Sequence, residues 1–89
     1  MVRVYVAEHC LGSQRAQRLV AQVRLCYPDA ALEIVDITIP GTVIPPEIFA
    51  TPIYTWNDHI IFLGNPSETA LLDYIRRDYE YNGHRHQRN

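Results

Sequence analysis

The chain has 89 residues, the length of one small domain, and its apolar fraction of 47% is ordinary for a globular protein. A net charge of −2 gives no reason to expect a nucleic-acid partner. No apolar run approaches the roughly 20 residues of a membrane-spanning helix, so we expect no membrane partner. Because the first six residues already form a strand pattern, we expect no signal peptide and a cytoplasmic location. Nothing in the sequence indicates an oligomeric state.

The first part of the chain has the pattern of strand, helix and strand. Valine occupies every second position of residues 2–6, which predicts a strand. Apolar residues then recur at helical spacing from Ala16 to about Tyr27, with Ser13 as the expected N-cap. Residues 32–37 predict a second strand. This βαβ unit should have parallel strands and a right-handed crossover.

The second part of the chain predicts two more strands and a helix. A loop rich in proline is followed by expected strands over 53–56 and 60–63, joined by a hairpin turn at Asn57 and Asp58. Ser67 should cap a last helix that ends near Tyr79. The predicted fold class is therefore α/β, in the order β-α-β-β-β-α, with a four-stranded mixed sheet. We expect one domain over residues 1–79 and a flexible polar tail over 80–89.

Cys10 is the main candidate for chemistry. It lies in the predicted turn between the first strand and the first helix, where backbone N–H groups favour a thiolate. A thiol in such a position has its pKa lowered from about 8.5 toward roughly 3.5–7.5. Ser13 would stabilise the thiolate with a hydrogen bond. His9 either tunes the thiol or is an exposed turn residue, and Cys10 itself is either reactive or a cysteine without a role in a binding domain.

The remaining cysteine and the histidines of the tail are weaker candidates for chemistry. Fifteen helical residues lie between Cys10 and Cys26 and separate them by roughly 24 Å, whereas bridged Cα atoms lie within about 7 Å, so we expect no internal disulfide. Cys26 is expected to be a core residue on the apolar face of the helix. His84 and His86 lie two residues apart in the tail and are weak ligands, so no metal site is expected.

The run Ala7-Glu8-His9-Cys10-Leu11-Gly12-Ser13 after the first strand, with Thr51-Pro52 before the third, resembles the thioredoxin/glutaredoxin superfamily. The resemblance implies that Cys10 is the nucleophile and that Ser13 replaces the second cysteine. It also implies that Pro52 is a cis-proline beside the thiol. In that family the backbone before this proline pairs with an extended substrate. Thr51, with His9, Leu11 and Pro52, would therefore line a substrate groove.

The Cys-x-x-Ser pattern departs from the dithiol members of that superfamily. Without a second thiol, Cys10 would need an external thiol such as glutathione to complete an exchange. The glutathione-binding glutaredoxins carry Thr-Val-Pro and a Gly-Gly pair, where this chain has Ala50-Thr51-Pro52 and Gly64-Asn65. The sequence therefore predicts no bound cofactor, with glutathione only a candidate co-substrate. An iron–sulfur carrier bridging two chains is the least supported function.

A second resemblance is to the KaiB-type, thioredoxin-like circadian clock proteins. It rests on Val4-Tyr5-Val6-Ala7, Ser13, Ala16, Ile34-Val35-Asp36, Ala50-Thr51-Pro52 and Ser67. It implies function through protein contacts without thiol chemistry. Two hypotheses follow. Cys10 exchanges with protein thiols or disulfides, including (de)glutathionylation, or the domain is a non-catalytic module that binds a protein partner in the groove near Pro52.

Overall fold

The computed structural model describes residues 1–87, with side chains described up to residue 80. The chain is an α/β fold in which a four-stranded mixed sheet carries two helices, in the predicted order β-α-β-β-β-α. The elements are β1 (Val2–Val6), α1 (Leu11–Cys26), β2 (Leu32–Asp36), β3 (Ile53–Trp56), β4 (His59–Leu63) and α2 (Glu68–Gln87).

The strands lie in the order β2-β1-β3-β4, so β2 and β4 are the outer strands. β1 pairs in parallel with β2, as the predicted βαβ unit requires, and antiparallel with β3. β3 and β4 form the predicted hairpin. Asn57 and Asp58 in its turn both have positive φ, of 49° and 70°, the backbone that a two-residue hairpin turn needs.

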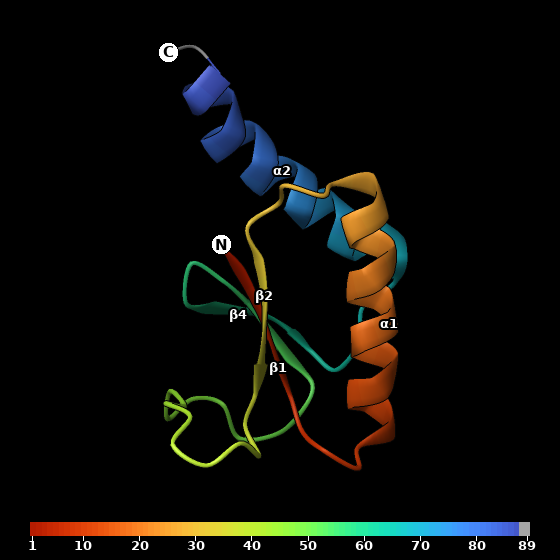
Figure 1. Cartoon of the computed structure of the whole chain (residues 1–89), viewed down its shortest axis with the longest axis vertical. Coiled ribbons are helices and arrows are strands. Elements are labelled where there is room, and N and C mark those ends of the chain that lie inside the picture. Colours follow the sequence, from red (N-terminus) through yellow and green to blue (C-terminus); the bar gives the residue numbers. More distant parts are fainter. Residues whose placement is uncertain (88–89) are drawn as a thin grey trace.

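The core lies between one face of the sheet and the two helices, which stand on the same side of it (Figure 1). The alternation of valines in β1 aims Val2, Val4 and Val6 at this face. The helical spacing of Ala16, Val20 and Val23 supplies the facing surface of α1. From α2, Leu71 and Ile75 are buried against the same cluster.

The opposite face of the sheet is covered by an irregular segment, residues 37–52, instead of a helix. This segment lies on the side away from α1 (Figure 1). Its Ile48 packs with Tyr5 and Ile53 in a second, smaller apolar cluster. Hydrogen bonds from Thr38 and Thr42 to Asp36 hold the start of the segment at the end of β2.

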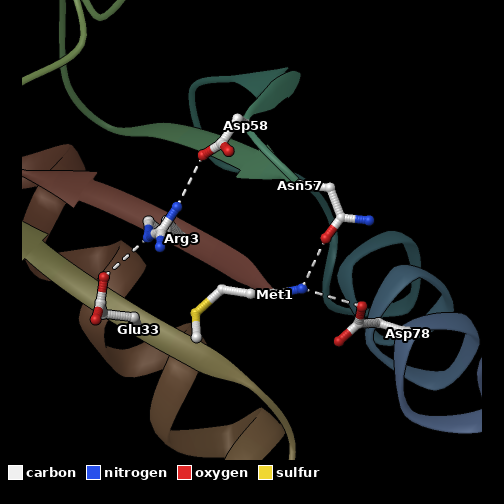
Figure 2. A network of polar contacts seen from close by, with 6 residues as sticks. All are labelled: Met1, Arg3, Glu33, Asn57, Asp58 and Asp78. Carbon is white, nitrogen blue, oxygen red and sulfur yellow. Dashed lines mark hydrogen bonds and ion pairs between the residues drawn. The ribbon is translucent and has the colours of Figure 1, made fainter. Parts of the chain in front are cut away.

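A polar network fastens the start of β1 to its neighbours (Figure 2). Asp78 of α2 is buried and accepts hydrogen bonds from the indole of Trp56 at 2.8 Å and from the Met1 amine at 3.1 Å. Arg3 forms ion pairs with Glu33 of β2 at 3.0 Å and with Asp58 of the hairpin turn at 2.8 Å. The network therefore joins β1 to β2, to the hairpin and to α2.

Two sequence expectations are corrected. Cys26 is exposed, not in the core, because the buried stripe of α1 continues through Tyr27, whose ring lies 5.5 Å from that of Tyr79. α2 continues past Tyr79 to Gln87, because charged residues can extend a helix beyond its packed part through pairs such as Arg76 with Glu80. Residues 88–89 and the side chains of His84 and His86 lie outside the described residues. Within the described chain, neither helix combines the length and apolarity needed to cross a membrane.

We expect Leu71→Ala to lower the free energy of unfolding by about 2–5 kcal/mol, because it removes a fully buried side chain and leaves a cavity. Leu25→Ala is the matched control, since this helical leucine is 77% exposed and its loss should change stability by less than about 0.5 kcal/mol. Urea unfolding followed by circular dichroism measures both. Equal losses in the two variants would contradict the packing of α2 on the sheet.

Candidate functional site

Cys10 is the N-cap residue of α1. Its backbone is extended, with φ of −108° and ψ of 118°, and its Sγ accepts a hydrogen bond from the Ser13 N–H at 3.3 Å. A side chain that accepts from the N–H groups of the first turn is what defines an N-cap. Ser13, which the sequence predicted as the cap, lies inside the first turn instead. The thiol is half-buried and so remains accessible.

Ser13 joins the end of β1 to the thiol. Its side chain is fully buried, and its Oγ accepts a hydrogen bond from the Ala7 N–H at 2.9 Å. Its hydroxyl also favours the thiolate of Cys10 and lowers the pKa of that thiol. A hydroxyl has one proton to donate, so with Ala7 supplying the accepted proton, the Ser13 proton is available to the sulfur.

Thr51 and Pro52 approach the thiol from the far end of the segment 37–52. The Thr51–Pro52 peptide bond is cis. The Thr51 hydroxyl donates to Sγ at 3.7 Å, and the Thr51 carbonyl oxygen lies 3.9 Å from the same sulfur. Within residues 1–87, the Thr51 N–H makes no hydrogen bond, so it is available to an incoming chain.

Gly12 allows Pro52 to come this close. A Cβ placed on Gly12 would lie 3.0 Å from Pro52 Cδ and 3.8 Å from Cys10 Sγ. The distance of 3.0 Å to Pro52 Cδ is shorter than carbon atoms usually tolerate. A side chain at position 12 would therefore push the proline away from the first turn of α1. Glycine is required here for space, not for an unusual backbone angle.

Asn65 is a structural residue of the site that the sequence analysis missed. Its Nδ2 donates to the Gly12 carbonyl oxygen at 2.9 Å, and its Oδ1 accepts from the Tyr54 hydroxyl at 2.8 Å. Next to it, the Gly64 N–H donates to the Pro52 carbonyl oxygen at 2.9 Å. The turn after β4 thus holds both Gly12 and Pro52. The sequence signal was a polar residue beside a turn glycine, which is too common to single out.

His9 and Leu11 flank the thiol but point into solvent. His9 has a positive φ of 61°, and its ring lies 3.5 Å from the Glu8 carboxylate. In the described residues no hydrogen bond joins His9 to Cys10, so the exposed-turn alternative describes its position. Leu11 is exposed, as are Phe49, shortly before Thr51, and Leu63, whose register partner is Ile53. Apolar side chains are therefore exposed on α1, on the segment 37–52 and at the end of β4, next to the turn that bonds to Pro52.

Hydrogen bonds lower the pKa of the Cys10 thiol to about 7. The Ser13 hydroxyl has the largest effect, followed by the Ser13 N–H and then the Thr51 hydroxyl, while partial burial opposes them. All three favour the thiolate because each donates to the sulfur. These hydrogen bonds therefore raise the population of the thiolate near neutral pH.

The other thiol of the chain does not reach this sulfur. Cys26 is at the far end of α1, which places it roughly 24 Å away along the helix. The part of the chain that the structure describes also contains no group of three or more histidine, cysteine and acidic residues that could hold a metal ion. The site therefore has one nucleophile and two hydroxyl donors.

We expect Ser13→Ala to raise the pKa of Cys10 from about 7 toward its ordinary value, because the largest stabilising hydrogen bond is lost. Only the thiolate is alkylated, so the rate with iodoacetamide should fall as the pH drops below the pKa. In a Cys26→Ser background, the midpoint of this profile should move to higher pH. Ser67→Ala is the control, since it also removes a serine hydroxyl that accepts a hydrogen bond from a backbone N–H, here that of Ala70 in α2. An unmoved midpoint in Ser13→Ala would contradict the role of Ser13.

We expect Gly12→Ala to lower the free energy of unfolding by about 1–3 kcal/mol through crowding against Pro52. This loss should exceed the gain of up to about 1 kcal/mol from the better helix propensity of alanine. Gln17→Ala, at an exposed position of the same helix, is the control. Thermal or urea unfolding decides, and a Gly12→Ala protein as stable as the parent would show that Pro52 is free to move.

Comparisons with known proteins identify no relative. No family model matches the chain, and neither the curated proteins nor the solved structures give a significant match. Its function has to be inferred from its own residues and their geometry.

Proposed function

We propose that this chain is a thioredoxin-like domain in which Cys10 acts as a single nucleophilic thiol in thiol–disulfide exchange. The observation that carries the proposal is the Cys10 sulfur itself, which is accessible, receives hydrogen bonds from Ser13 and Thr51, and lies beside Pro52. These contacts raise the thiolate fraction, and the thiolate is the reactive form.

The arrangement of the fold supports the thioredoxin-like part of the proposal. The thiol follows β1 at the start of α1, and the Thr51–Pro52 peptide precedes β3. Because β1 and β3 are antiparallel neighbours, the end of β1 and the start of β3 lie at the same end of the sheet, and the two segments meet there. This is the relation between thiol and proline that the resemblance to thioredoxins and glutaredoxins implies.

The exchange itself needs only the groups at the site and a disulfide substrate. The Cys10 thiolate attacks one sulfur of the substrate disulfide, forming a mixed disulfide as the original S–S bond breaks. The second substrate sulfur leaves as a thiolate and takes up a proton from water. Two oxidised sulfurs remain in the mixed disulfide, so no electrons are gained or lost overall.

Release of the mixed disulfide requires an external thiol. Ser13 stands where a dithiol protein has its resolving cysteine, and Cys26 is too far along α1. A second thiolate, such as that of glutathione, attacks the mixed disulfide and frees Cys10. A reducing compartment such as the cytoplasm, which the sequence leads us to expect, would supply it. The substrates would then be protein disulfides or glutathionylated protein thiols.

The second candidate is a non-catalytic module that binds a protein partner at the same place. The specific observation in its favour is the combination of exposed Leu11, Phe49 and Leu63 with the unpaired N–H of Thr51. An extended partner segment would bond to the backbone of Thr51 and cover the apolar side chains. The thiol would not be needed, as the resemblance to KaiB-type proteins implies.

We expect Cys26→Ser to form a mixed disulfide with oxidised glutathione at neutral pH and Cys10→Ser to do so at least about tenfold more slowly, because hydrogen bonds favour the thiolate of Cys10. Mass spectrometry of the protein after timed quenching measures both rates. Cys26 is exposed and Cys10 is half-buried, so a faster reaction at Cys10 could not be explained by greater accessibility. A slow reaction in Cys26→Ser would reject the redox function. If Cys10→Ser then also bound a partner peptide as tightly as the parent, the module function would be favoured.

A further inference from the structure

A relay of three hydrogen bonds ends on the Cys10 sulfur. The Ser13 N–H donates to Sγ at 3.3 Å. The carbonyl oxygen of the same peptide group, that of Gly12, accepts from Asn65 Nδ2 at 2.9 Å. Asn65 Oδ1 accepts in turn from the Tyr54 hydroxyl at 2.8 Å. The relay therefore joins β3, the turn after β4 and the first turn of α1 to the thiol.

The direction of each bond in the relay follows from the groups that make it. The Gly12 carbonyl can only accept, so the nitrogen of the Asn65 carboxamide faces it. The oxygen of that carboxamide therefore faces Tyr54, and the phenol has to donate. Burial raises the pKa of Tyr54 to about 12, so the phenol keeps its proton at neutral pH. Every group in the relay thus donates in the direction of the sulfur.

This alignment strengthens the last bond of the relay. Resonance couples the oxygen and nitrogen of an amide, so a hydrogen bond accepted by the oxygen makes the N–H more polar. Aligned hydrogen bonds polarise one another in this way, by about 10–30% per bond. The relay passes through two amides, the Asn65 side chain and the Gly12–Ser13 peptide. The Ser13 N–H is therefore a better donor to the sulfur than an unassisted amide, and a better donor favours the thiolate.

Both ends of the relay are held in the core. Tyr54 is fully buried, and its ring packs edge-on against that of Phe62 at 6.0 Å between centroids. Ser13 is also fully buried. The peptide between Gly12 and Ser13 is bonded on both sides, from Asn65 at its oxygen and to the sulfur at its nitrogen. Its orientation toward Cys10 thus depends on a residue some fifty positions away in sequence.

We propose that Asn65 is a positioning residue for the Cys10 thiol, which it serves by orienting and polarising the Gly12–Ser13 peptide in a hydrogen-bond relay that begins at Tyr54. Asn65 acts through that peptide and is not a catalytic residue. The inference rests on the proposed function, because the relay matters for chemistry only where Cys10 is the reacting thiol. A purely structural Asn65 would fasten the turn after β4 and leave the ionisation of Cys10 unchanged.

The test is the pH dependence of the alkylation of Cys10 by iodoacetamide in a Cys26→Ser background. In Asn65→Ala the midpoint should rise by at least about 0.3 pH units, about a twofold change in the ionisation constant. Tyr54→Phe keeps the buried ring and removes only the hydroxyl that begins the relay. Its midpoint should move in the same direction by a smaller amount. An unmoved midpoint in Asn65→Ala would overturn the proposal.

Two controls separate the relay from a general loosening of the fold. Tyr74→Phe removes the hydroxyl of another tyrosine whose ring packs on Phe62, at 5.5 Å, but which lies outside the relay. Asn57→Ala loses a side-chain hydrogen bond to the Met1 amine, at the end of β3 away from the thiol. Neither should move the midpoint, with circular dichroism establishing that every variant is folded at the assay temperature. Shifts in these controls as large as that of Asn65→Ala would also overturn the proposal.

The relay and the redox function fail in different experiments. Iodoacetamide reports the ionisation of Cys10 without any disulfide substrate. Among the described residues no charged side chain contributes to the lowered pKa of this thiol, and His9 and Glu8 face solvent, so the midpoint reports hydrogen bonds to the sulfur. A shifted midpoint in Asn65→Ala with a slow reaction toward oxidised glutathione would keep the relay and reject the redox function. A fast reaction with an unmoved midpoint would do the reverse.

Nuclear magnetic resonance on the protein with Asn65 intact makes the test independent of how well that variant folds. Ionisation of the sulfur strengthens each bond of the relay, so the side-chain N–H signal of Asn65 should shift with the same midpoint as Cys10. In Cys10→Ser the signal should stay constant over the same pH range. A constant Asn65 signal while Cys10 ionises would contradict the relay.

Discussion

The close contact between Pro52 and the first turn of α1 is the constraint on which the site depends. Gly12 leaves just enough space for the proline ring, and Asn65 and Gly64 hold the two sides of the contact by their carbonyl groups. Only with this contact in place does the Thr51 hydroxyl reach the Cys10 sulfur. The acidity of one surface thiol is thus determined by packing between segments that are some forty residues apart in sequence.

The hydrogen bonds around Cys10 also explain why a serine is useful three residues after the thiol. Ser13 satisfies the Ala7 N–H at the end of β1 and at the same time donates toward the sulfur. A buried hydroxyl must find partners, since an unsatisfied polar group costs about 1–3 kcal/mol. The same side chain therefore satisfies the backbone at the end of β1 and stabilises the Cys10 thiolate.

Much of the architecture could be predicted because it depends on local patterns. The valine alternation in β1, the apolar spacing of α1 and the Asn57-Asp58 turn predicted the order of elements, and the βαβ rule predicted the parallel pair.

Cys10 was placed correctly at the start of a helix, but Ser13 was wrongly preferred as the cap, because cap propensities favour serine over cysteine. Asn65 was missed because its partners, Gly12 and Tyr54, are distant in sequence. The isomer of the Thr51–Pro52 bond does not follow from the residues, since most such bonds are trans, and only the family resemblance implied cis.

The irregular segment over residues 37–52 has a consequence for motion. It covers the sheet face opposite the helices mainly through Ile48, and it ends in Thr51, the residue that donates to the thiol. Segments with few buried contacts open locally at a small fraction of the free energy of global unfolding. Each such opening would uncover Tyr5 and draw the Thr51 hydroxyl away from Cys10. The thiolate fraction of Cys10 would therefore vary with the local opening of residues 37–52.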